Sequence, residues 1–110
     1  MNKTDKIKAI QKTILEAEKR PGDEIILHDL LEKTGDIKRN YQHYLTTGDL
    51  DIELEQIPDA DYELCTALLT ATLREGYRSM FDNTIRQRAK AGEIRALLER
   101  MVETLQNSES

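Results

Sequence analysis

The stretch YELCTALLTATLREGYRSMFDNTIRQR, residues 62–88, decides the fold class of this chain. Its apolar residues recur at the spacing of one face of an α-helix. We therefore predict one long helix that begins at Asp59 or Asp61 and runs to about Arg88. The apolar stripe consists of Tyr62, Cys65, Leu68, Leu69, Leu73, Tyr77, Met80, Phe81 and Ile85.

A last helix follows, and a break near Ala91-Gly92 separates it from the long one. Extending the first stripe past Ile85 reaches Ala89 and Gly92, which are out of phase with Ile94. Two helices therefore fit this pattern better than one rod. The apolar residues of the last helix are Ile94, Leu97, Leu98, Met101, Val102 and Leu105.

Upstream, we predict three shorter helices. The first begins after a cap at Asn2 or Thr4 and stops before Pro21-Gly22, a strong helix break. The second has Asp23 at the N-cap position and Gly35 as its C-terminal stop. The third covers residues 37–45, with Asp36 as its cap and Gly48 ending it.

The pattern of residues 49–57 fits two secondary structures, a strand and a helical turn. Leu50, Ile52 and Leu54 alternate with acidic residues, which is the pattern of a half-buried strand. As a helical turn, Leu50 and Leu54 share a face and Ile52 points away. A lone strand would have no ladder partner in a helical domain, so both alternatives stay open. The sequence thus predicts an all-α fold, a small bundle of about five helices, with residues 49–56 either helical or extended.

Length and composition predict one domain over residues 1–106 and a frayed tail over 107–110, because 110 residues are too few for two ordinary domains. The single cysteine, Cys65, permits no internal disulfide. No segment has the pattern of an export signal or the length of a membrane span. We therefore expect a cytoplasmic protein that does not enter a membrane.

The net charge of −5 is concentrated in one segment. Residues 49–63 contain seven acids and no Lys or Arg, while the rest of the chain is close to neutral. Asp59, Asp61 and Glu63 lie at the start of the long predicted helix, where negative side chains interact favourably with the helix dipole, so they need no further explanation. The earlier part of the segment suits docking onto the basic surface of a protein partner. The expected contact residues are Asp49, Leu50, Asp51, Ile52, Glu53, Leu54 and Glu55.

Residues 27–45 offer an alternative function, a helix–turn–helix that binds DNA. Two short helices would flank the turn at Gly35, and polar side chains on the second would contact bases and phosphates. Leu31 and Asp36 depart from the usual pattern of such motifs. The residues that would contact DNA are Lys38, Arg39, Asn40, Gln42 and His43.

The C-terminal helices carry a strip of Ile94, Leu98, Met101 and Leu105 that either covers the core or meets a second copy in a homodimer. They also carry much of the basic charge. We interpret these basic residues as part of a solvent-exposed helix face whose charge is balanced by Glu75, Asp82 and Glu93. The basic residues are Arg74, Arg78, Arg86, Arg88, Lys90 and Arg95.

The sequence predicts neither an enzyme nor a bound cofactor or metal. Cys65 lies in an apolar stripe, where a buried structural thiol is expected instead of a nucleophile. His28 and Glu32, one helical turn apart, are expected to form an exposed ion pair. We therefore expect a small helical regulator or adaptor that binds a protein partner.

Overall fold

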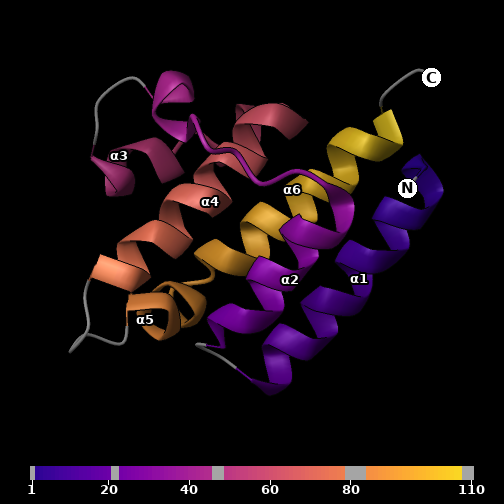
Figure 1. The fold of residues 1–110 in the computed structure, drawn as a ribbon, viewed down its shortest axis with the longest axis horizontal. Helices are drawn as coiled ribbons and strands as arrows, with labels where there is room; N and C mark the ends of the chain where they lie inside the picture. Colours follow the sequence, from indigo (N-terminus) through magenta and orange to yellow (C-terminus); the bar gives the residue numbers. More distant parts are fainter. Residues whose placement is uncertain (1, 21–22, 46–48, 79–83, 108–110) are drawn as a thin grey trace.

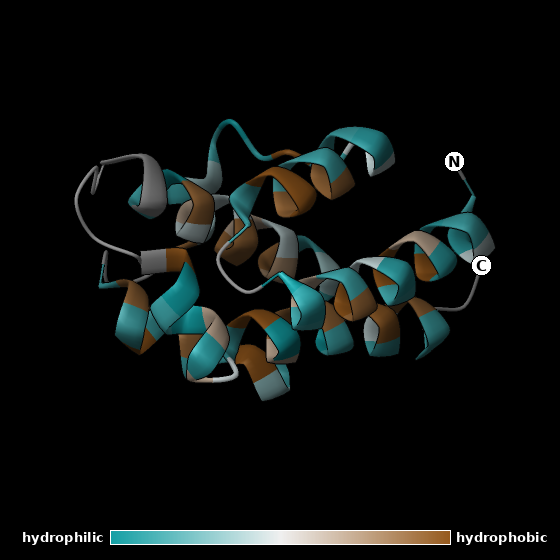
Figure 2. Cartoon of the chain, turned by 90° about the horizontal axis from the view of Figure 1, so that it is seen from below, coloured by the Kyte–Doolittle hydropathy of each residue, from teal (hydrophilic) through white to brown (hydrophobic). Residues whose placement is uncertain are grey.

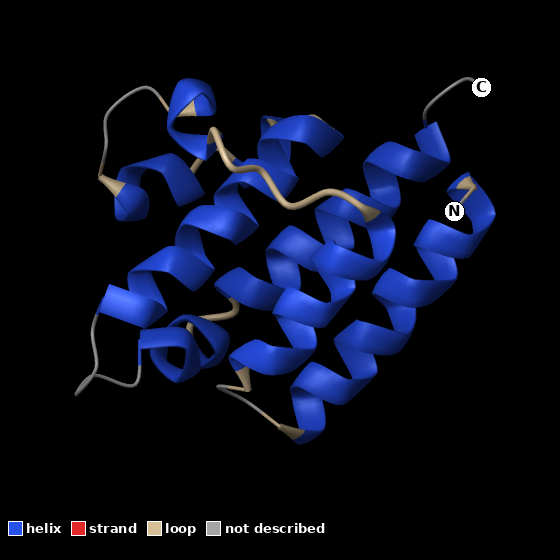
Figure 3. Ribbon diagram, viewed as in Figure 1, coloured by secondary structure: helices blue, strands red, loops and turns tan. Residues whose placement is uncertain are grey.

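A computed structural model of the chain describes residues 2–20, 23–45, 49–78 and 84–107. Within these residues there are six α-helices, two short 3-10 helices and no strand (Figure 3). The all-α prediction is therefore confirmed. The α-helices are α1 (Lys3–Lys19), α2 (Glu24–Thr34), α3 (Leu50–Leu54), α4 (Tyr62–Arg78), α5 (Thr84–Lys90) and α6 (Glu93–Asn107). The 3-10 helices are η1 (Tyr41–Tyr44) and η2 (Ile57–Asp59).

The predicted caps of the first two helices are confirmed. The Asn2 side chain accepts a hydrogen bond from the backbone N of Asp5 at 2.8 Å, and Asp23 does the same for Ile25 at 3.0 Å. Gly35 ends α2 with φ at 76°, a left-handed conformation that glycine adopts without strain. Gly92, with φ at 83°, separates α5 from α6 as predicted.

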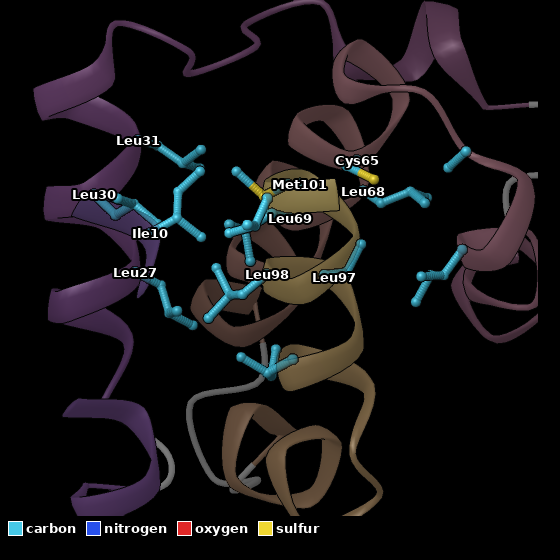
Figure 4. Close-up of a cluster of buried hydrophobic side chains, with 14 of the residues drawn as sticks. Ile10, Leu27, Leu30, Leu31, Cys65, Leu68, Leu69, Leu97, Leu98 and Met101 are labelled. Atoms are coloured by element: carbon cyan, nitrogen blue, oxygen red, sulfur yellow. The ribbon is translucent and has the colours of Figure 1, made fainter. Parts of the chain in front are cut away.

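The core lies between α1, α2, α4 and α6. In Figure 1, α2 and α6 occupy the middle of the molecule, with α1 on one side and α4 on the other. Hydrophobic and hydrophilic residues alternate along each helix, as amphipathic packing requires (Figure 2). Figure 4 shows Ile10 and Leu31 pointing toward Leu69 and Met101 across the interior. The largest fully buried apolar side chains are Ile10, Leu27, Leu31, Cys65, Leu68, Leu69, Leu97, Leu98 and Met101.

The predicted helix over residues 37–45 is wrong, because only Tyr41–Tyr44 is helical, as η1. Asp36 does not cap a helix here. Its Oδ2 accepts a 2.5 Å hydrogen bond from the Tyr62 hydroxyl, and the backbone N of Lys38 donates to the Thr70 hydroxyl at 3.4 Å. The first bond attaches the Asp36 side chain to α4 and the second attaches the Lys38 backbone to the same helix, so the chain continues here as an irregular segment.

The extended alternative for residues 49–56 is also wrong, since Leu50–Leu54 forms α3. The Asp49 side chain caps this helix by accepting from the backbone N of Asp51 at 3.0 Å. The alternation misleads because Ile52, which looked like a buried strand residue, is 47% exposed. Leu54 is buried instead, and Glu53 beside it is buried as well.

The single helix predicted to reach Arg88 is two helices, α4 and α5, which pack against each other. The guanidinium of Arg88 bonds Glu75, 13 residues earlier. In one continuous helix these residues would lie roughly 20 Å apart, beyond the reach of both side chains. Met80 and Phe81, assigned to the predicted stripe, lie outside the described residues. At the C-terminus, Asn107 is the last residue of α6. The rest of the predicted tail, residues 108–110, also lies outside the described residues.

Candidate functional site: the acidic surface of α3

The structure divides the seven residues predicted to contact a partner into two groups. Leu50 is half-buried, while Glu53 and Leu54 are buried and hold α3 against the core. Glu53 is 0% exposed, and it accepts a hydrogen bond from the Gln56 amide at 3.3 Å. These three residues are therefore placed to position α3 and not to touch a partner.

The other four predicted residues are exposed. Asp49, Asp51, Ile52 and Glu55 face solvent, and Asp59 of η2 is exposed nearby in sequence. We call these five residues the acidic surface. Ile52 is its one apolar member, and few large apolar side chains elsewhere in the described chain are as exposed. A hydrophobic side chain thus lies within a group of carboxylates.

The carboxylates of the acidic surface differ in how they are bonded. Asp49 caps α3, and Asp51 accepts a 2.8 Å hydrogen bond from the Arg88 guanidinium. Glu55 and Asp59 make no side-chain hydrogen bond or ion pair with any residue that the structure describes. These two side chains therefore keep their full charge available to a basic partner.

Arg88 of α5 joins four helices beside this surface. It makes a bidentate pair with Glu75 of α4 at 2.7 and 2.9 Å, and its Nη1 bonds Asp51 of α3 and Glu93 of α6. The Arg88 side chain is only 10% exposed. The hydrogen bonds that the Arg88 guanidinium donates to Glu75 raise its pKa most, and burial lowers the pKa by less, so the guanidinium stays charged. The sequence interpretation of Arg88 as part of a solvated basic face is therefore wrong.

The residues predicted to contact DNA are not presented on an α-helix. Arg39, Asn40, Gln42 and His43 are exposed, but they belong to the irregular segment and to η1. The Lys38 ammonium forms a 2.5 Å ion pair with Glu63 and its side chain is 16% exposed. Burial lowers the Lys38 pKa, but the hydrogen bond and charge of Glu63 outweigh this and raise it overall. Among the described residues, the second element of the predicted motif is therefore only the 3-10 helix η1 and not an α-helix.

A buried polar cluster near η1 was not anticipated from the sequence. Asp36 is 7% exposed, and besides the Tyr62 hydroxyl it pairs with the Lys6 ammonium at 3.3 Å. Lys6 also lies 5.4 Å from the centre of the Tyr62 ring. Burial and the bond to Asp36 raise the pKa of Tyr62. The cluster is internally satisfied, so its evident role is to fix the α2–η1 connection against α1 and α4.

The one potential group of metal-ligating side chains in the described residues lies on α2. His28 and Glu32, which the sequence predicts to pair, lie with Nδ1 and Oε2 separated by 3.6 Å. Asp29 brings a third ligand atom within 4.8 Å of the others. Asp29 and Glu32 are exposed to solvent.

Cys65 is buried on α4, as its place in the apolar stripe predicted. Burial raises the pKa of its thiol to about 12, so almost none of it is thiolate near neutral pH. We expect the native protein at pH 8 to resist an aromatic disulfide reagent and to react fully once denaturant unfolds it. Labelling of the native protein at the rate of a small free thiol would contradict the buried position.

Within the described residues, no helix is long and apolar enough to cross a membrane. The chain matches no protein-family model, no curated protein and no solved structure.

Proposed function

We propose that this chain is a non-enzymatic helical adaptor or regulator that binds a protein partner through the acidic surface. The observation that carries the proposal is the position of Ile52, which is 47% exposed on a helix whose one other exposed residue is Asp51 and whose exposed capping residues, Asp49 and Glu55, are also acidic. An exposed apolar side chain ringed by charge suits an interface in which an anchor enters a pocket and charges orient the approach.

The charge of the acidic surface defines the chemistry of the partner. Glu55 and Asp59 make no ion pair with any described residue, and Arg88, bonded to Asp51, also bonds the carboxylates of Glu75 and Glu93. The partner that fits is therefore a protein with Lys and Arg side chains around an apolar pocket for Ile52.

The way α3 is held supports the same proposal. Leu54 and Glu53 are buried beneath the helix, and Arg88 binds Asp51 from α5. An interface that is already ordered loses less conformational entropy on binding. The short helix thus presents Ile52 and Glu55 in a fixed arrangement.

The test compares two double variants that change charge and hydrophobicity equally. Ile52→Ser with Glu55→Lys alters the acidic surface; Ile25→Ser with Asp29→Lys alters exposed positions on α2, where Ile25 is 66% exposed. Asp51 and Glu53 are left intact because both help to hold α3 in place.

We expect the wild type and the α2 variant to capture the same partner, with affinity that falls as salt rises. The α3 variant should bind that partner at least about tenfold more weakly, the loss expected of one interface anchor. Equal capture by all three proteins, each confirmed folded by circular dichroism, would refute the proposal.

A further inference from the structure

An open groove of about 310 Å³ lies on another part of the molecule, between α1 and the junction of α5 with α6. Helices α1 and α6 pack side by side along their lengths, and α5 packs on α6. The groove lies where this packing leaves space. Its volume is at the lower end of the range of small-molecule sites.

Apolar side chains form most of the groove. Ile14 and Ala17 contribute from α1, Ala89 from α5, and Ile94 and Leu98 from α6. Ala17 and Ala89 are half-buried, and their small side chains leave the volume open. An apolar molecule seated here would cover hydrophobic surface that the fold leaves partly in contact with water.

The rim of the groove carries charges of both signs. Glu18, Lys90 and Arg95 line it, and Glu18 pairs with Arg95, which also bonds Glu99 at 2.7 Å. Lys90 makes no ion pair with any described residue. Lys90 therefore supplies a cation that has no ion-pair partner among the described residues.

The same edge is where α6 begins. Gly92, which precedes α6, also lines the groove and has no side chain that could accept from the first N–H groups of the helix. Those N–H groups and the helix dipole favour a negative group at this end. Lys90 and the start of α6 thus reinforce each other beside an apolar surface.

We propose that this groove binds a small amphipathic carboxylate. Its apolar body lies against Ile14, Ala17 and Leu98, and its carboxylate pairs with Lys90 at the start of α6. A helix or strand of a partner protein would need a longer groove than this volume provides. The site is separate from the acidic surface, and neither proposal depends on the other.

The first probe is decanoate, added to the isotope-labelled protein below its micelle concentration and followed by amide NMR shifts. We expect saturable binding at one site, with the largest shifts at residues around Gly92 and along one face of α1. Decanol and decyltrimethylammonium have a similar apolar body with a neutral or cationic head, and should bind at least about fivefold more weakly, the size of one exposed charge contact. Equal binding of all three, or no saturable binding of decanoate, would overturn the proposal.

Variants locate the site. Ala89→Leu fills the groove and should abolish decanoate binding, and Ala17→Leu is a second filling variant if the first disturbs folding. Lys90→Gln should weaken binding about fivefold, while Lys12→Gln, at an exposed lysine of α1 outside the groove, should leave it unchanged. Unchanged affinity in a folded Ala89→Leu or Ala17→Leu protein would refute the location. The α3 double variant should bind decanoate like the wild type, so this test fails or succeeds independently of the proposed function.

Discussion

Replacing Arg88 by methionine is expected to lower the free energy of unfolding by about 3 kcal/mol, the lower end of the cost of breaking a buried ion pair. The guanidinium is 10% exposed and bonds carboxylates of Glu75, Asp51 and Glu93. Without it, three negative groups face one another with no cation between them. We expect a cost at the lower end of that range because water screens part of this repulsion. The side chains of Glu75 and Glu93 are about a third exposed, and that of Asp51 is more exposed.

Arg86 provides the matched control for this experiment. It lies on the same short helix, is exposed and makes no ion pair with any described residue. Arg86→Met should therefore change stability by less than about 0.5 kcal/mol in the same urea titration. If the two variants lost similar stability, Arg88 would not be the residue that connects α3, α4, α5 and α6.

Leu69→Ala is expected to cost about 3 kcal/mol, the usual range for truncating a fully buried leucine. Leu69 is 0% exposed in the middle of α4 and lies among side chains from α2 and α6 (Figure 4). The lost methine and two methyl groups leave a cavity that the close-packed helices cannot fill. Urea denaturation followed by circular dichroism measures the loss.

The comparison for Leu69 is Leu15→Ala on α1, where the side chain is 61% exposed. The same truncation there removes little buried surface and should change stability by less than about 0.5 kcal/mol. A loss for Leu69→Ala as small as that for Leu15→Ala would place Leu69 outside the core.

The four longer helices could be predicted because their signals are local. Asn2, Asp23 and Gly35 satisfy helix ends with nearby groups, and the apolar stripes of α4 and α6 have helical spacing. Residues 37–45 could not be assigned correctly, because their backbone is set by bonds to Tyr62 and Thr70 on another helix. Contacts between residues far apart in sequence leave no periodic pattern.

The candidate site was predictable as a segment but not residue by residue. Charge density singled out residues 49–55, yet the alternation of apolar and acidic residues could not show that Glu53 is buried while Ile52 is exposed. Arg88 was missed for a similar reason. Its pairing with Asp51 spans 37 residues and depends on the packing of α5, which the continuous apolar stripe concealed.

The most direct test of the proposed function is site-specific photo-crosslinking in the native cell. The crosslinking amino acid p-benzoylphenylalanine replaces Ile52 in one protein and Ile25, which is 66% exposed on α2, in another. We predict one discrete, larger adduct from position 52 that Glu55→Lys weakens, and no corresponding adduct from position 25. No adduct at position 52, or the same adducts from both positions, would contradict binding through the acidic surface.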